Sequence, residues 1–433
     1  MDSPVRCTWY SLSNFMLLGG LVLPAQDLPP GVLMLSRIRA HVREAVDRLP
    51  DCTCIENVAR YQKPAGKVLK PLDTVVLQIL FSGNRELFAS PGDTHWQADP
   101  GAFIGAGMIG NGLFALHLRA VFLNNQSIIK YHGMESVGGR AEARYDFSIS
   151  QMMSGFHVSH GLFSSVVGTS GSFWADPDTY DLHRLEFHAD DLPPELLYRE
   201  VSTAIYYERV RIGESDVLLP QQADLRVVDA DGVENRDLIE FTHCQGFHTE
   251  STLHFGADDS ATGAATGSPK AAQSEGTLPP DLRITVALTT PIDEHAAVGS
   301  LIEGKVVGSL IQKKKVVVAD GASVEGRIRR LERHSGAGDY FIVALEFTRV
   351  EVTGQDLRFY ADLEDLDHPV GQDLSLRSMT FESGSPDVSR VTTVRTNAIP
   401  GVGTFFVRGS HFTLPAGFKT VWKTQLFPRS ATQ

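Results

Sequence analysis

GSFWADPDTYDLHRLEFH, at residues 171–188, is the stretch that decides the fold. It holds two runs of alternating apolar and polar residues, on either side of a turn at 176–179 that is rich in aspartate and proline. That order predicts an antiparallel β-hairpin. Large apolar side chains flank the turn on both sides: Phe173, Trp174, Leu182, Leu185 and Phe187. Some other part of the molecule, or a ligand, must cover this apolar surface.

Outward from the hairpin, the alternation of apolar and polar residues continues through most of the first half of the chain. About ten segments alternate in this way, with turn-forming residues between them. They are 54–61, 74–81, 86–90, 127–132, 143–150, 163–174, 182–188, 202–212, 224–229 and 237–244. A helix is expected before them at 35–49, because apolar residues recur there at steps of three and four and Pro50 follows. We predict a long antiparallel meander with one leading helix.

A glycine-rich segment interrupts the meander at 101–112 and leads into a second expected helix at 113–123. That helix is apolar on more than one side, so we expect it to be buried on the concave face of a curved sheet. Gly105-Ala106-Gly107 resembles a nucleotide-binding turn only superficially, because no strand of a βαβ unit precedes it. We predict no cofactor.

The bulk composition restricts the class of partner. The chain has 433 residues, 42% of them hydrophobic, which is enough for two or three compact domains. A net charge of −13, from 39 basic and 52 acidic residues, argues against nucleic acid or an anionic membrane surface as the main partner. Basic clusters at 313–315 and 327–330 are interpreted as solvated strand faces.

The first 25 residues have the features of a secretory signal peptide. Arg6 precedes an uncharged run from Cys7 to Leu23, and Ala25 is a small residue at a suitable cleavage site. A retained membrane helix is the alternative, but the run falls short of the ~20 apolar residues that a span prefers. We therefore expect a periplasmic or secreted protein without a stable membrane span.

After signal removal, Cys52, Cys54 and Cys244 would remain in an oxidising compartment. An odd number predicts one disulfide and one leftover thiol. Cys52 and Cys54 are two apart on an expected strand and therefore point to the same side. Cys54 lies further inside that strand, which favours a Cys54–Cys244 bridge and makes the first and last strands neighbours. Three free buried thiols are the alternative.

Metal and catalytic sites find little support in the sequence. His157 and His160 fall in a stretch of strand and turn, where their spacing puts the rings on opposite faces. His243, Cys244 and His248 are the best metal candidates, yet adjacent strand residues diverge. No G-x-S-x-G motif occurs at a strand-to-helix turn, and paired aspartates are explained by solvation. We predict no metal site, no catalytic residue and no enzymatic activity.

Residues 256–280 are built mainly from Gly, Ala, Ser, Thr and Pro and are predicted to be a flexible linker. The linker separates a predicted domain at 31–255 from a second one at 281–424. The second domain again shows alternating segments, with glycines at the expected bends. We predict a small C-terminal β-barrel after an α+β first domain, hence a mainly β protein.

The order of elements in the first domain resembles the LolA/LolB-like superfamily of periplasmic lipoprotein carriers. The likeness lies in the leading helix, the meander with an internal helix, and a strand motif formed by Trp174, Asp176, Pro177, Thr179, Leu182, Arg184 and Glu186. It covers 31–255 and implies an unclosed, helix-plugged β-barrel from a Gram-negative envelope, whose hollow can hold an acyl chain. Nothing in the sequence marks a lipoprotein-sorting surface, so lipoprotein transfer is not implied.

The segment from Val316 to Arg330 resembles the periplasmic β-barrel of VirB10/TrbI secretion-channel proteins. Gly321, Val324 and Gly326 are the residues that carry this likeness. It implies a barrel within 281–424, which we interpret as an independent module used for binding or stability.

Two functions from different classes follow. The first is a non-enzymatic carrier that binds an acyl chain, a lipid or another apolar ligand in the half-barrel hollow. Its expected liners are Phe103, Ile104, Met108, Phe114, Leu116, Phe173 and Trp174. The second is a structural or assembly protein of the envelope, whose hollow is filled by its own side chains and which acts through an envelope protein partner.

Overall fold

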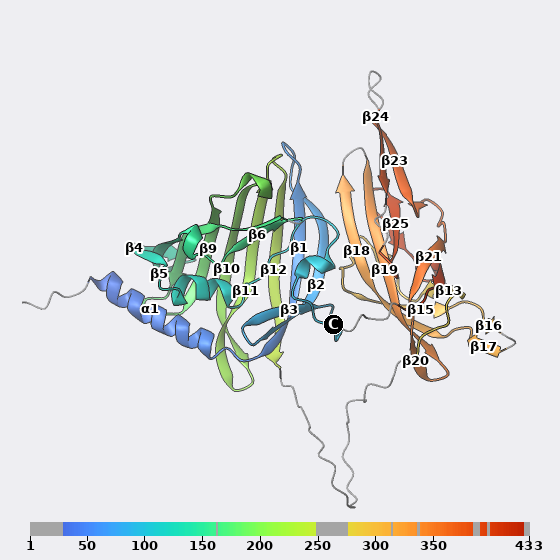
Figure 1. Ribbon diagram of the computed structural model, residues 1–433, viewed down its shortest axis with the longest axis horizontal. Coiled ribbons are helices and arrows are strands. Elements are labelled where there is room, and N and C mark those ends of the chain that lie inside the picture. Colours follow the sequence, from blue (N-terminus) through green and yellow to red (C-terminus); the bar gives the residue numbers. More distant parts are fainter. Residues whose placement is uncertain are drawn as a thin grey trace, which may run out of the picture.

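The computed structural model describes residues 29–161, 163–247, 276–312, 315–335, 338–383, 390–395 and 399–427. The predicted signal peptide at 1–25 and residues 256–275 of the predicted linker lie outside this part. Figure 1 shows two β-rich bodies side by side, the first coloured blue to yellow-green and the second orange to red. The mainly β fold is as predicted.

Ten antiparallel strands form the first sheet, in the order β3-β2-β1-β12-β11-β10-β9-β8-β5-β4. Their bounds are Cys52–Lys63 (β1), Lys70–Ser82 (β2), Arg85–Ala89 (β3), Ile128–Val137 (β4), Arg140–Ile149 (β5), Gly168–Ala175 (β8), Leu182–Asp190 (β9), Tyr198–Ile212 (β10), Ser215–Asp229 (β11) and Glu234–Gly246 (β12). The sheet curls into an open half-barrel with β3 and β4 at its edges (Figure 1). The predicted meander is confirmed.

The hairpin at 171–188 is β8–β9, and Phe173 pairs with Leu185 across it. An Asp176 carboxylate oxygen accepts hydrogen bonds from the backbone N–H groups of Asp178 and Thr179, each at 2.8 Å. This side chain therefore closes the turn by the local capping that aspartate favours.

Helix α1, at Pro30–Asp47, packs against one side of the half-barrel through Ile38, Val42 and Val46. It begins five residues before the predicted 35, because proline at the first helical position has its backbone φ set for a helix and needs no N–H partner. His41 and Arg209 both contact the Asp181 carboxylate just after the hairpin turn, at 2.7 Å, which fixes the helix to the sheet.

The chain between β3 and β4 runs over the concave face, and we call residues 100–123 the plug. It contains the 3₁₀ turn η1 (Pro100–Phe103), the short helix α2 (Leu116–Leu118) and the π-helical turn η2 (Arg119–Leu123). The predicted helix at 113–123 is shorter at its start, because Gly112 has a φ of +81° and the N–H of Phe114 donates to a side chain. Beside the plug lie η3 (Gln151–Met153), η4 (Pro194–Leu196) and a separate hairpin of β6 (His157–His160) and β7 (Phe163–Val166). The strand predicted at 163–174 is therefore divided between β7 and β8.

The second sheet has the order β21-β27-β13-β15-β18-β19-β25-β22, and β20 pairs with β19. Its bounds are Arg283–Leu288 (β13), Leu301–Val306 (β15), Ser323–Ser335 (β18), Asp339–Val352 (β19), Gln355–Arg358 (β20), Ala361–Leu366 (β21), Asp373–Ser375 (β22), Gly403–Arg408 (β25) and Lys419–Thr424 (β27). Strand β21 contacts β25 near the other end of the order, so the sheet curls as a barrel-like domain requires.

Three two-stranded pairs accompany this sheet. They are β14 (Ile292–Asp293) with β26 (Thr413–Leu414), β16 (Leu310–Gln312) with β17 (Lys315–Val318), and β23 (Ser378–Ser383) with β24 (Arg390–Arg395). The last five residues of the predicted linker also pack here: Leu278 is buried, and its N–H donates to the carbonyl of Arg358.

The two sheets are joined by backbone hydrogen bonds. The N–H of Val76 on β2 donates to the carbonyl of Val298, and the N–H of Val298 donates to the carbonyl of Thr74, both at 2.8 Å. Gly299 follows with a φ of +92°, and a Cβ there would lie 2.3 Å from the carbonyl oxygen of Val76. Only glycine fits this approach. Among the described residues, no helix combines the length and apolar character needed to cross a membrane.

Candidate ligand-binding site in the half-barrel

The concave face of the first sheet is covered by aromatic side chains of the plug. The ring of Phe114 lies 5.1 Å from that of Phe241 on β12 and 6.2 Å from that of Phe81 on β2. Further along, the ring of Phe122 lies 4.7 Å from that of Phe173 on β8. All five rings are buried. The plug therefore occupies the hollow that the sequence assigned to a ligand.

Polar side chains of the sheet hold the plug by its backbone. The Glu86 carboxylate accepts the N–H groups of Gly112, at 2.5 Å, and Phe114, at 2.8 Å. The Arg60 guanidinium donates to the carbonyl of Ala106 at 2.5 Å. Gly107, with a φ of +75°, would bring a Cβ to 3.4 Å from Arg60. Between these attachments the plug has no regular secondary structure.

Buried polar groups face the plug from the sheet. Glu56 alternates with the inward residues Cys54 and Val58 on β1, and Asp237 lies two residues before inward Ile239 on β12. Tyr207 is two residues after inward Ile205 on β10. Glu56 and Tyr207 are 1% exposed and Asp237 is 2% exposed.

These groups share a second property. Within the described residues, one carboxylate oxygen of Glu56, one of Asp237 and the hydroxyl of Tyr207 have no hydrogen-bond partner. A buried polar atom without a partner costs about 1–3 kcal/mol. We call Glu56, Asp237 and Tyr207 the buried polar row.

Burial changes the ionisation of the row. Desolvation raises the pKa of Glu56 well above its usual range, and the nearby charges of Glu86 and Asp237 add to the effect. Desolvation also raises the pKa of Asp237 to about 8, although Arg60 acts in the opposite direction. The pKa of Tyr207 is raised by burial and by the charge of Glu86. At neutral pH the Asp237 carboxyl group is therefore mostly protonated.

Arg60 offsets the effect of burial on Asp237 only in part, because it is already paired with another carboxylate. It forms a bidentate ion pair with Asp73 of β2, with distances of 2.6 and 2.5 Å, and both side chains are 1% exposed. Glu332 of β18 in the second sheet lies close enough to raise the pKa of both partners. Glu332 itself is paired with Arg330 and His334 at 2.7 and 2.9 Å.

The seven expected liners do not all meet. Phe103, Phe114 and Phe173 lie in the main core, and Ile104 packs against it. Met108 instead packs against a separate cluster around Val201, Leu225 and Val227. Leu116 is 53% exposed at the start of α2.

Trp174 lies on the opposite face of the sheet from its neighbour Phe173, as the strand period requires. Its indole N–H donates to Glu135 at 2.8 Å, and the guanidinium carbons of Arg144 and Arg184 lie 5.3 and 4.9 Å from its ring. Trp174 is therefore buried under charged side chains on the convex side.

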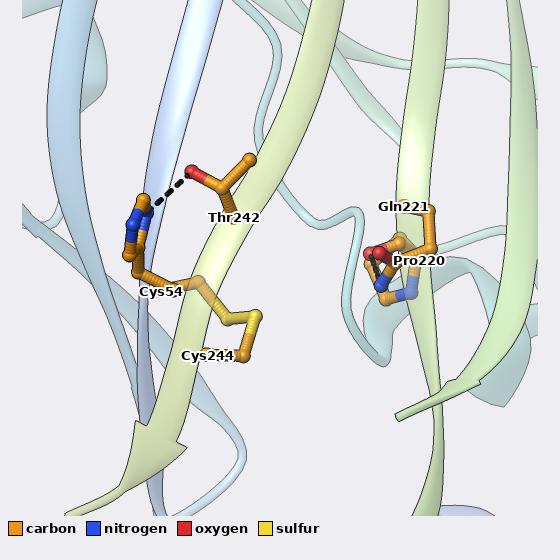
Figure 2. The surroundings of a disulfide bond; sticks show 6 residues. Cys54, Pro220, Gln221, Thr242 and Cys244 are labelled. Atoms are coloured by element: carbon orange, nitrogen blue, oxygen red, sulfur yellow. Dashed lines mark hydrogen bonds between the residues drawn. A yellow bond between two sulfur atoms is a disulfide. The ribbon is translucent and has the colours of Figure 1, made fainter. Parts of the chain in front are cut away.

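The Cys54–Cys244 disulfide is present and joins β1 to β12. Figure 2 shows the bond lying across these two adjacent strands, close to Thr242. The prediction that the first and last strands of this sheet are neighbours is confirmed by their antiparallel pairing. Cys52 is the leftover thiol; it is buried, and desolvation raises its pKa to about 11.

The histidine candidates do not assemble a metal site in the part of the chain that the structure describes, which contains no suitable group of three or more His, Cys, Asp or Glu. Cys244 is in the disulfide, and His248 lies outside the described residues. His117, which sequence reasoning passed over, lies 4.3 Å from the ring of Phe187, and burial lowers its pKa to about 4.

No family model and no curated protein sequence matches the chain. Its structure is similar to a LolA superfamily protein from Nitrosomonas europaea, with 12% identity, 49% of this chain and 94% of that chain covered, and a TM-score of 0.26. It is also similar to a DUF1329 family protein from Desulfovibrio piger, with 13% identity, 52% of this chain and 96% of that chain covered, and a TM-score of 0.27. ComB10 of the Com type IV secretion system of Helicobacter pylori is similar with 12% identity, 35% of this chain and 92% of that chain covered, and a TM-score of 0.18.

Proposed function

We propose that this chain is a non-enzymatic carrier of the bacterial envelope, which binds the apolar chain of a lipid-like ligand on the concave face of the half-barrel. One observation carries the proposal: the hollow is filled by a segment that takes no part in the sheet. Apolar side chains that include Leu113, Phe114 and Phe122 fill it, and the segment is held by hydrogen bonds that Glu86 accepts and Arg60 donates. The plug can therefore leave while the sheet stays intact.

Replacement of the plug by a ligand exchanges one buried apolar surface for another. Six large apolar side chains of the plug lie in the main core, and exposing all of them costs about 2 kcal/mol each, or about 12 kcal/mol in total: Phe103, Leu113, Phe114, Leu118, Val121 and Phe122. An alkyl chain of about twelve carbons that takes their place gains about 0.8 kcal/mol per buried methylene, or about 10 kcal/mol. This gain offsets most of the cost of exposing the plug, so a ligand of that length is expected to compete when only part of the plug leaves the hollow.

The test uses protein that has been unfolded, freed of lipid and refolded. A neutral long-chain alcohol with a fluorescent group is titrated into the wild type and into Phe114→Ala. Removal of the Phe114 ring weakens the plug and opens space in the hollow, so we expect tighter binding by the variant. Phe347→Ala is the matched control, because Phe347 is equally buried but lies in the second sheet. Absence of binding in both wild type and Phe114→Ala would reject the carrier.

The filled hollow also favours a second candidate. If the plug never leaves, the chain is a structural or assembly protein of the envelope that acts through a protein partner. Mass spectrometry of lipid extracts distinguishes the two: an acyl-chain ligand co-purifies with a carrier, whereas a structural protein gives an empty extract and no binding after refolding.

A further inference from the structure

Near its start, the plug lies on both sheets at once. A Cβ atom at Gly105 would collide with Nε of Arg330 and would lie 2.5 Å from Oε1 of Glu332, both on β18 of the second sheet. The carbonyl of the next residue, Ala106, accepts a hydrogen bond of 2.5 Å from Arg60 of the first sheet. Figure 1 shows β18 beside β2 at the junction of the two sheets. Two consecutive residues of the plug therefore contact polar groups of both domains.

The two atoms of β18 that face Gly105 lack hydrogen-bond partners within the described residues. They are Nε of Arg330, a donor, and Oε1 of Glu332, an acceptor. Glu332 is 0% exposed, and its other carboxylate oxygen lies 2.7 Å from Arg330 and 2.9 Å from His334. A donor and an acceptor without partners therefore meet at one point, which the glycine covers without bonding to either atom.

The charges around this point balance. Arg60 is bound by Asp73. Glu332 is bound by Arg330 and His334. The charge of Glu332 also acts on the Arg60–Asp73 pair across the junction, so the two sets of groups lie close to each other. A charged ligand group would lose its hydration here and find no free counter-charge, which is costly in a buried place. An uncharged group that both donates and accepts hydrogen bonds fits instead.

We propose that the ligand carries an uncharged amide or hydroxy-ester head, which takes the place of Gly105 and Ala106 at the junction of the two domains. Arg60 then donates to the ligand carbonyl, as it now donates to the carbonyl of Ala106. Arg330 and Glu332 of the second domain bind the donor and acceptor groups next to that carbonyl. This inference rests on the proposed function and specifies both the class of ligand and the part of the second domain that completes its site.

The alkyl chain has a covered route from this head into the hollow. Beyond Arg60, the inward side chains of β1 are Val58 and Glu56, and both are buried. The four residues from Arg60 to Glu56 span about 13 Å of strand. Glu56 pairs in register with Phe241, whose ring packs against that of Phe114 in the plug. A chain that starts at Arg60 and follows β1 therefore reaches the place of the Phe114 ring.

The test compares N-(2-hydroxyethyl)dodecanamide, dodecanol, dodecanoic acid and dodecylamine as competitors of the fluorescent alcohol. We expect the amide to bind about tenfold more tightly than the other three, the factor that one hydrogen bond to a charged group supplies. Arg330→Met should lower the preference for amide over alcohol severalfold. Arg60→Met/Asp73→Leu, which removes the buried ion pair as a unit, should abolish it. Arg329→Met is the matched control, because Arg329 lies on the same strand but pairs with Glu346, and it should keep the preference.

The outcomes separate the two proposals. If amide and alcohol bind equally, or if the acid or the amine binds best, the head site is rejected and the apolar carrier stands. If the preference for amide survives unchanged in Arg330→Met, the second domain does not complete the site and the inference fails. It also fails if the preference survives in Arg60→Met/Asp73→Leu. If no probe binds to the refolded wild type or to Phe114→Ala, both proposals fall.

Discussion

Asp237→Asn should stabilise this protein at neutral pH, which is unusual for a change at a fully buried position. The carboxyl group has a pKa of about 8 in the folded chain and its ordinary value of 3.8 in the unfolded one. At pH 7 the folded state must keep a proton that the unfolded state has released. One pKa unit corresponds to about 1.36 kcal/mol. Because pH 7 lies about three units above the unfolded pKa, keeping this proton costs the folded state about 4 kcal/mol.

The sign of the pH dependence follows from the raised pKa. A raised folded pKa gives stability that is fully present below the unfolded value, near pH 4, and is lost as pH rises toward 8. Asparagine has the same shape and does not titrate. The variant should therefore match the wild type near pH 4 and exceed it by about 2–4 kcal/mol at pH 7, because relaxation reduces the full penalty.

Urea unfolding followed by circular dichroism, at half-unit steps from pH 4 to pH 9, measures this difference. Asp224→Asn is the control, since its carboxylate is partly exposed and pairs with Arg236, and it should change stability by less than about 1 kcal/mol. A wild type and Asp237→Asn that differ by a constant amount across this range would refute the buried, protonated state of Asp237.

Three further predictions concern the framework around the site. The Cys54→Ser/Cys244→Ser variant should lose about 5 kcal/mol of unfolding free energy on the chain-entropy model, because the disulfide closes a loop with a sequence separation of 190. Equal urea midpoints for the variant and the wild type would contradict this. Cys52 should resist iodoacetamide at pH 8 until urea unfolds the chain, since its pKa is about 11, and rapid labelling of the native protein would count against its burial. Gly299→Val should lower the thermal midpoint by several degrees. Gly321→Val should lower it less, because Gly321 shares the positive φ but a Cβ there meets no neighbour within 4 Å. Similar losses in the two variants would show that only backbone strain matters.

The strands were predictable because apolar and polar residues alternate along a strand that has one buried face and one solvent face. That rule placed the hairpin at 171–188 and all ten segments of the first sheet in strands. The expectation that both Phe173 and Trp174 line the hollow did not apply this rule, which puts neighbouring strand residues on opposite faces and leaves open which of them faces inward. The structure resolves this through the Phe122–Phe173 contact and the guanidinium groups around Trp174.

The buried polar row was not predicted, because a charged residue on a strand normally marks the solvent side. Glu56 lies two residues from both Cys54 and Val58, so strand alternation puts it on their inward face, and this spacing could have revealed its burial. Asp237 stands two places before Ile239 in the same way. The plug geometry depends on long-range contacts, such as Glu86 with Phe114, that no local pattern encodes. Packing of the two sheets through Val76 and Val298 is long-range for the same reason.

The central claim, that a ligand replaces the plug on the concave face, is tested most directly by amide hydrogen exchange of the refolded protein with and without a neutral long-chain alcohol. The N–H groups of Gly112 and Phe114, which Glu86 protects, should exchange faster when the ligand is bound, while those of β1 and β12 should keep their protection. Unchanged or slower exchange at Gly112 and Phe114 under saturating ligand would contradict the account.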